Sequence, residues 1–291
     1  VGPLPRPLQR AVAATRLGEE LADVFMQSFA GCEVITQHPY GLSVLLSVAE
    51  REGVEEEERH PIDVMSLAAA AVLESTLRVG PGEREKCLEV LEVVALEIQR
   101  QSPRDCVSSA SIRDVLQLEQ PHLVGLWGKL QDSLCSGKTV LLQPGRPFPG
   151  EGPSIRFINS VFKDYFLARC YVKYTVSGQF LALPLFEDML LDPRWDTFFG
   201  YMFAIAEKSE LPFTVNMQSR KIDAGQVRHL VQHFAAWTRP MLRLIFGQSQ
   251  VCDFSLLGEV LRDTGHTLRH LALRCNALGT PGAGVLAAWL R

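Results

Sequence analysis

Residues Leu134 to Pro144 read LCSGKTVLLQP, and the tripeptide Gly137-Lys138-Thr139 within them decides between two folds. A nucleotide-binding P-loop requires Gly-x-x-x-x-Gly-Lys-[Ser/Thr] between a strand and a following helix, so that backbone amides surround the phosphates. Here Asp132 stands where the first Gly is needed, an amphipathic run precedes the loop, and the β-prone residues 139–142 follow it. This order predicts a helix, a Gly turn and a hairpin strand, and it argues against a phosphate-binding loop.

The segments on either side of this turn predict a small helical module that contains the hairpin. Ser108, Ser109 and Ser111 offer N-caps for a helix over about 112–118, and the next helix covers about 121–135. A Gly/Pro-rich insert separates the β-like residues 140–142 from 155–158, and a helix from Ser160 to Tyr171 closes the unit. Helix, helix, hairpin, helix is the layout of a winged-helix module, which we place at residues 106–175.

Residues 1–105 carry helical periodicity and predict the helices of a first helical domain. Residues 1–10 hold three prolines and predict an irregular lead-in. Val64 to Leu77 is helical, and its alanines at 68–71 indicate close helix contacts. Three apolar stripes mark further helices: Leu17, Leu21, Val24 and Phe25; Leu42, Leu45, Leu46 and Ala49; and Leu88, Leu91, Val94, Ala95 and Ile98.

The C-terminal part has a different pattern. A short second helical segment is predicted over 176–210, and residues 211–291 predict an α/β solenoid of about three leucine-rich units. Residues 268–278 fit the signature L-x-x-L-x-L-x-x-N-x-L, and the first two units are degenerate. The repeat predicts that Leu271 and Leu273 point into the core. The corresponding positions in the two earlier units are Leu242 and Leu244, 29 residues before, and Val215 and Met217, a further 27 residues before. The helix positions behind these strands are Leu230, Phe234, Leu257, Leu261, Leu286 and Leu290. The fold class is therefore mostly α with a small hairpin module, followed by a leucine-rich solenoid.

Composition narrows the classes of function. The chain has 291 residues and 47% apolar content, enough for more than one packed domain. A net charge of −4 argues against binding to nucleic acid or an anionic membrane, which both favour basic surfaces. Seven cysteines without a Cys-x-x-Cys pair fit a reducing compartment. No apolar run reaches the roughly 18 residues of a membrane span, and no signal peptide follows Val1. We expect a cytoplasmic protein whose N-terminus is cut from a longer chain.

Residues that would carry catalysis or bind a metal are few. The pairs His229/His233 and His266/His270 have helical ligand spacing, but zinc needs further ligands and neither pair encloses the Glu of a metalloprotease. The sequence contains no Gly-x-Ser-x-Gly elbow and no Cys with convincing His and Asn partners. We therefore predict no catalytic residue and no metal site.

DNA binding by the hairpin module is also disfavoured. The helix that would enter a groove, over about 121–135, carries only Lys129 against Asp132. A groove-reading helix needs several basic contacts to neutralise phosphates, so we expect no nucleic-acid partner.

The order of these parts resembles a known receptor class. Gln37–Leu46, QHPYGLSVLL, resembles the Asn-Pro-Leu-Leu-Leu stretch in the first helical domain of NACHT-type STAND NTPases, the class that includes NOD-like receptors. Phe157–Arg169, FINSVFKDYFLAR, is similar to their winged-helix motif, commonly Phe-x-His-x-Ser-Phe-Gln-Glu-Tyr-x-Ala-Ala. Leu191–Trp195, LDPRW, looks like the short stretch that follows, and the leucine-rich units then stand where such receptors carry their sensor. The resemblance spans nearly the whole chain.

The resemblance implies a nucleotide site. In this family ADP lies between the nucleotide-binding core, the first helical domain and the winged helix, with a Pro near the adenine and a His at the β-phosphate. Pro39 matches the first role. Asn159 stands in place of the His, and an Asn amide donates a hydrogen bond without a positive charge. The P-loop and Walker B segments would lie upstream of Val1, so ADP or ATP is expected only with that domain. The isolated chain is expected to hold no cofactor and to hydrolyse no ATP.

Two functions remain open from the sequence. One is a fragment of a nucleotide-switched signalling receptor of innate immunity, which binds a protein ligand or effector through its repeats and self-associates through the missing NTPase domain. The other is a leucine-rich scaffold or adaptor that binds protein without nucleotide control. Asn159 favours the second function, and the order of motifs favours the first. An upstream P-loop roughly 150–200 residues before Pro39, a typical domain length, would discriminate between them.

Overall fold

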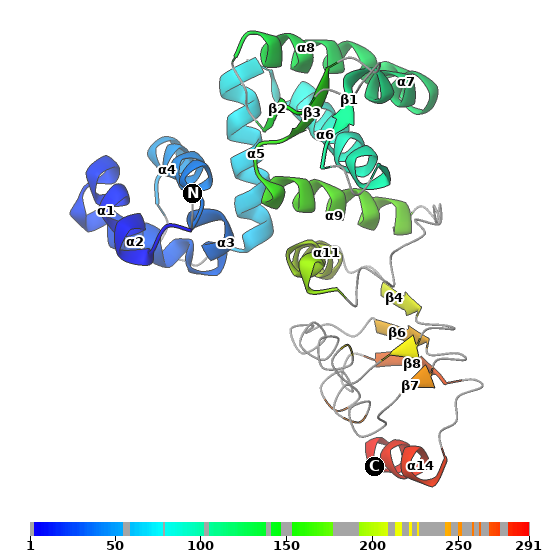
Figure 1. Ribbon diagram of the computed structural model, residues 1–291. Coiled ribbons are helices and arrows are strands. Elements are labelled where there is room, and N and C mark those ends of the chain that lie inside the picture. The colour runs from blue at the N-terminus through cyan, green and yellow to red at the C-terminus, as the bar shows by residue number, and fades with distance from the viewer. Residues whose placement is uncertain are drawn as a thin grey trace. The chain divides into compact units, whose positions relative to one another are not determined.

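The computed structural model is mostly helical and divides into two compact units, Val1–Cys170 and Tyr171–Arg291, with the boundary inside the helix that spans residues 160–176 (Figure 1). The residues described are 3–54, 59–77, 79–101, 105–137, 141–146, 153–176, 192–208, 213–216, 221–222, 226, 242–245, 250–251, 258, 262, 268–273 and 279–290. Across these ranges, none of the helices has both the length and the apolar character that a membrane crossing requires. The four-part division predicted from the sequence stays a prediction.

The first unit contains most of the helices and one small sheet. Its elements are α1 Arg6–Leu17, α2 Glu19–Ser28, η1 Ala30–Cys32, α3 Glu33–Thr36, α4 Pro39–Glu52, α5 Pro61–Leu77, α6 Pro81–Arg100, β1 Val107–Ser108, α7 Ser109–Glu119, η2 Pro121–Leu123, α8 Val124–Cys135, β2 Leu142–Pro144, β3 Ser154–Phe157 and α9 Ser160–Val176. The second unit continues with η3 Pro193–Trp195, α11 Asp196–Lys208, β4 Phe213–Asn216, β5 Lys221–Ile222, β6 Leu242–Ile245, β7 Gln250–Val251, β8 Leu268–Ala272 and α14 Gly279–Trp289.

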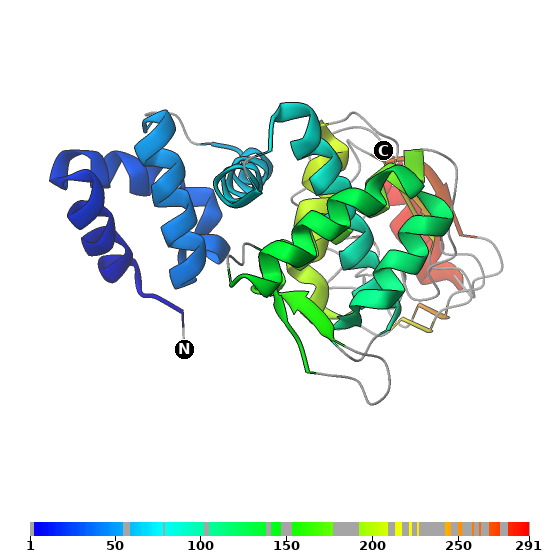
Figure 2. The ribbon, with the colours of Figure 1, turned by 90° about the horizontal axis from the view of Figure 1, so that it is seen from above.

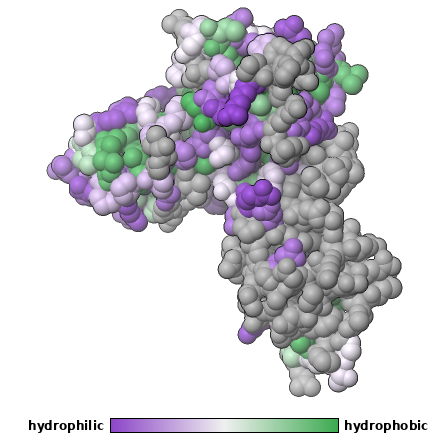
Figure 3. Space-filling view, in the orientation of Figure 1, coloured by the Kyte–Doolittle hydropathy of each residue, from purple (hydrophilic) through white to green (hydrophobic). Residues whose placement is uncertain are grey.

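The N-terminal helices differ from the prediction in two ways. Helix α1 already begins at Arg6, because proline is tolerated in the first turn of a helix, where its missing N–H has no partner to lose. The irregular lead-in is therefore wrong for residues 6–10. Gly18, with a φ of 92°, then ends α1 and splits the first predicted stripe between two helices. As a result Phe25 is fully buried whereas Leu21 is 46% exposed, and apolar atoms reach the surface of these helices (Figure 3).

The other predicted helices of residues 1–105 are confirmed. Helix α5 packs against α4, α6 and α8. Its alanines at 68 and 69 are fully buried, and such small side chains let neighbouring helices approach closely. Helix α6 buries its predicted stripe, including Leu91 and Val94.

The hairpin module has the predicted order of elements and one strand more. The Ser108 side chain accepts a hydrogen bond from the backbone N–H of Ser111 at 3.0 Å and so caps α7, as predicted. Strands β2 and β3 form an antiparallel hairpin that lies beside the helices (Figure 2). The added strand, β1, pairs with the other edge of β3 to give the sheet order β1-β3-β2. Gly137 makes the turn after α8 with a φ of 72°, while Lys138 and Thr139 lie outside the described residues.

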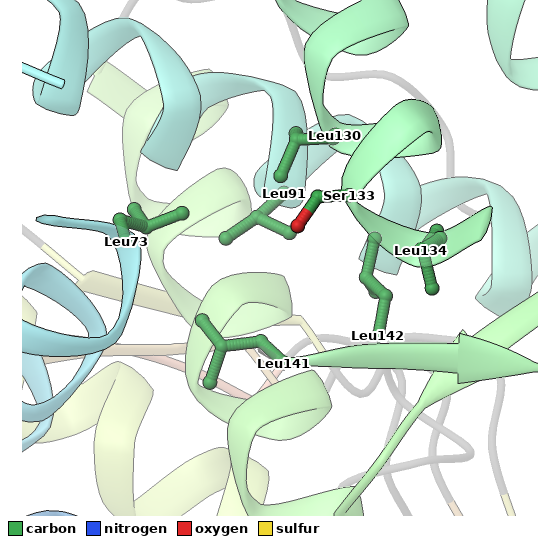
Figure 4. A pocket seen from close by; sticks show the side chains of 7 residues that line it. All are labelled: Leu73, Leu91, Leu130, Ser133, Leu134, Leu141 and Leu142. Atoms are coloured by element: carbon green, nitrogen blue, oxygen red, sulfur yellow. The ribbon is translucent and has the colours of Figure 1, made fainter. Parts of the chain in front are cut away.

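The core under the hairpin is closed. A cavity of about 10 Å³ lies between α5, α6, α8 and the start of β2, and Figure 4 shows leucine side chains around it with Ser133 as the polar one. A volume of about 10–15 Å³ is the least that holds one water molecule. This part of the module therefore has no room for a ligand.

In the second unit, a parallel sheet joins β4, β6 and β8 in that order. Val215 pairs with Leu244, and Leu244 pairs with Leu271. The predicted equivalence of Leu244 with Leu273 is wrong by two residues, and the sheet also contains an irregularity beside Leu242. Because side chains alternate along a strand, a shift of two keeps the same residues on the same face.

The remaining predictions for this unit are tested only in part. The predicted C-terminal helix is present as α14, and β5 pairs with β7 in a second short parallel sheet. Leu271 and Leu273 are half-buried. Other predicted repeat positions lie outside the described residues: Met217, Leu230, Phe234, Leu257 and Leu261. The stretch before β4 contains the predicted helical segment as α11, whose Phe198 and Phe199 are fully buried.

Candidate functional site at the starts of helices α4 and α9

The first half of the site is the N-terminus of α4. Pro39 is the first residue of the helix and is exposed, and the backbone N–H of Leu42 donates to the carbonyl of His38 at 2.8 Å to close the first turn. Gly41 is required here because a Cβ at this position would overlap the carbonyl oxygen of Ile35. The close approach of α3 to α4 therefore fixes the direction in which Pro39 and Tyr40 leave the turn.

The second half of the site is the N-terminus of α9. Asn159 is the residue before this helix, and its side-chain oxygen accepts a hydrogen bond from the backbone N–H of Val161 at 2.9 Å. Asn159 is only 6% exposed, and within the described part of the chain its amide nitrogen is buried without a hydrogen-bond partner. Buried polar groups almost always have a partner, so an unsatisfied donor at this position asks for an explanation.

The fold brings the two halves together. The rings of Tyr40 and Phe162 meet edge to face, with their centroids 6.4 Å apart and their planes at 71°. Phe162 is fully buried, and Tyr40 is half-buried. The contact places the segment that contains Pro39 beside the segment that contains Asn159, although more than a hundred residues separate them in the sequence.

One lysine and two aspartates lie close together near the start of α9. The ammonium of Lys163 lies 3.1 Å from a carboxylate oxygen of Asp105 and 3.9 Å from one of Asp164. Burial raises the pKa of Asp164 to about 7, with Asp105 adding to the rise and Lys163 opposing it. Burial also raises the pKa of Tyr40 to about 12, so its phenol stays neutral in the physiological range.

An ion-paired arginine holds α9 in place. The guanidinium of Arg169 donates to Glu92 at 2.8 Å and to Glu85 at 3.0 Å, both on α6, and lies 5.8 Å from the centre of the Tyr165 ring. Burial alone lowers the pKa of this guanidinium, but Tyr165, Glu92 and Glu85 together hold it above its ordinary value. Glu92 is 5% exposed, so the pair is mostly hidden from water and fixes the position of α9 against α6.

This arrangement can recognise an anion at the start of α9. The N-terminus of a helix presents free backbone N–H groups and a partial positive charge, and the unsatisfied amide of Asn159 adds a donor at the same place. The donor is covered, however, so a phosphate can reach it only if Asn159 releases its cap on Val161 and turns outward. Ser160, which follows it, is already exposed.

Sequence reasoning found some of these residues and missed others. Pro39 and Asn159 were predicted, and the structure places them in neighbouring segments. The burial of Asp164 was missed, because nothing in the pattern KDYF separates a buried from an exposed carboxyl. Glu92 did leave a signal, since it stands inside an otherwise apolar stretch of α6 and so asks for a buried cation.

The histidine pairs weighed as metal ligands remain largely untested. His229, His233 and His266 lie outside the described residues, and His270 lies in β8. Over the part of the chain that is described, no three His, Cys, Asp or Glu side chains gather in a way that could hold a metal ion.

No protein-family model matches the chain. No curated protein matches it at a significant level.

Proposed function

We propose that this chain is the helical, winged-helix and early leucine-rich part of a cytoplasmic, nucleotide-switched signalling receptor of the NACHT type. Its starting segments of α4 and α9 would face an adenine nucleotide held mainly by an NTPase domain of the same protein. The observation that carries the proposal is the Tyr40–Phe162 contact, because it joins the two motifs that the family uses around ADP.

The parallel strands support the sensor half of the proposal. Strands β4, β6 and β8 pair in sequence order, with Phe213 opposite Leu242 and Leu244 opposite Leu271. Parallel strands that recur at such intervals, with a helix after the last of them, fit the long class of leucine-rich repeat. We therefore propose that residues 211–291 form a leucine-rich solenoid and that this solenoid binds a protein ligand.

The switch would work by population shift. With ADP bound, contacts from α4 and α9 favour a closed form, and a ligand on the repeats favours an open form that self-associates. A ligand shifts such an equilibrium only by its difference in affinity for the two forms. The arginine clamp from Arg169 to Glu92 and Glu85 would make α9 and α6 move together.

A second function, a leucine-rich scaffold without nucleotide control, has one specific observation in its favour. Asn159 replaces the family histidine and uses its oxygen to cap its own helix, with the amide nitrogen covered. In this alternative the residue is a helix cap, and the starts of α4 and α9 bind no phosphate.

An Asn159→His variant separates the two functions. We expect the unchanged chain to bind ADP no better than about 1 mM, which is only about 4 kcal/mol. Near pH 6 an imidazolium adds a charge-assisted contact to the β-phosphate, so the variant should bind ADP about tenfold more tightly. Binding is measured by calorimetry, and AMP serves as the ligand control because it has no β-phosphate.

A matched variant completes this test. Gln117→His places the same side chain on an exposed position of α7 and should leave ADP affinity unchanged. If Asn159→His and Gln117→His have equal affinities, or if AMP gains as much as ADP, the scaffold is favoured and the nucleotide-facing role of Asn159 is lost.

A further inference from the structure

A second concave site lies at the beginning of the first unit, and one of its lining residues, Gln37, stands just before the start of α4. A cavity of about 390 Å³ opens between the N-terminal segment, α1, α2 and α3. This volume is within the range of roughly 300–1,000 Å³ that small-molecule pockets occupy.

The N-terminal wall of this cavity is held by hydrogen bonds from two sides. The backbone N–H of Leu4 donates to the carbonyl of Gln37 at 2.7 Å, and the side-chain amide of Gln9 donates to the carbonyl of Leu4 at the same distance. Gln9 is only 3% exposed although it is polar. Because the Gln9 amide is buried and hydrogen-bonded to Leu4, it holds the segment around Leu4 in place as one wall of the cavity.

The lining defines the chemistry of the ligand. Met26, Phe29 and Leu4 give an apolar floor, next to prolines at 3 and 5. Arg6 is the one charged residue among the described residues that line the cavity, and its side chain is exposed. An exposed guanidinium beside apolar surface suits a carboxylate, which it can bind through two parallel hydrogen bonds.

We propose that this cavity binds a small organic carboxylate with an apolar body, whose acid group pairs with Arg6 while its body packs on Met26 and Phe29. A cation is disfavoured because no acidic side chain lines the described walls. Gln37 is the lining residue nearest to the proposed nucleotide site, but neither Pro39 nor Asn159 lines the cavity, so the proposal does not rest on the nucleotide role of those two residues.

The test uses para-fluorophenylbutyrate as the probe and the complete 291-residue chain. The line width of its fluorine NMR signal reports binding, and para-fluorophenylbutanol is the uncharged control ligand. We expect the acid to bind about tenfold more tightly than the alcohol, which is the discrimination of one charge-assisted contact. Arg6→Glu should remove this preference and leave the binding of the alcohol unchanged.

Two further variants keep the test decisive. Arg113→Glu makes the same charge reversal on an exposed position of α7 and should preserve the preference for the acid. Met26→Trp fills the cavity from a half-buried position and should abolish binding of both probes, with circular dichroism used to check the fold.

Several results would overturn the proposal. The first is equal affinity for the acid and the alcohol, and the second is an equal loss of the preference for the acid in Arg6→Glu and Arg113→Glu. The third is unchanged binding of both probes to a folded Met26→Trp variant. The fourth is no binding of the acid up to about 10 mM, which corresponds to a binding free energy under about 3 kcal/mol. Displacement of the probe by ADP would also overturn it, because the cavity would then belong to a nucleotide site. Failure of Asn159→His to raise the affinity for ADP would leave this proposal untouched.

Discussion

Replacing Phe162 by alanine should lower the free energy of unfolding of the first unit by about 3–5 kcal/mol, the usual cost of truncating a buried phenylalanine. Phe162 is fully buried in the first turns of α9, as its helical spacing from Phe166 predicted. Truncation removes apolar burial and leaves a cavity that the surrounding helices fill only in part. It also removes the edge-to-face contact with Tyr40.

The measurement is a urea unfolding curve followed by circular dichroism. Leu118→Ala is the matched control, because Leu118 is an 84% exposed leucine of α7 and its loss should cost little. A Phe162→Ala curve that overlaps the Leu118→Ala curve would mean that the buried face of α9 is wrongly assigned.

Asp164 should make the stability of the first unit depend on pH. Its pKa is about 7 in the folded protein and 3.8 in its ordinary state, so the folded form holds a proton that the unfolded form has released. The stabilising effect of this proton is complete below about pH 4 and is lost as the pH rises through about 7. The loss is on the order of 4 kcal/mol, since each unit of pKa shift corresponds to about 1.4 kcal/mol.

Asp164→Asn removes this dependence. The amide is neutral at every pH, so the variant should be the more stable protein near pH 8, and the advantage should shrink as the pH falls toward about 4. Unfolding curves at several pH values measure it, with Asp114→Asn on the exposed face of α7 as the control. A constant difference across the pH range would show that folding does not raise the pKa of Asp164.

Local patterns in the sequence predicted most of the helices and the hairpin. Apolar periodicity gave α5 and α6, and a serine cluster gave the cap at Ser108. Strand β1 was missed because two residues are too short to display alternation. The register of the parallel strands was missed by two residues, because leucines two positions apart share a face of the strand and leucine spacing does not show which of them pairs with Leu244.

The two motifs of the candidate site could each be predicted from the sequence, but their proximity in space could not. Pro39 and Asn159 each stand in a short pattern, but the contact that joins them depends on how α4 and α9 pack. The same holds for Asp164, whose burial depends on neighbours far away in the chain. For the ion pair between Arg169 and Glu92, the sequence shows only an acidic residue in an apolar stretch. Its partner is identified by the fold.

The most direct test is an NMR titration of ADP into the chain labelled only at asparagine. The sequence contains three asparagines, at 159, 216 and 276, so the side-chain amide signals are few, and loss of one pair in Asn159→His assigns that residue. If α9 faces the β-phosphate, ADP at about 10 mM should move the Asn159 amide signals and leave the other two pairs in place, as expected for millimolar affinity. AMP should move them much less. Unmoved Asn159 signals, or equal shifts with ADP and AMP, would contradict a nucleotide-facing site at the starts of α4 and α9.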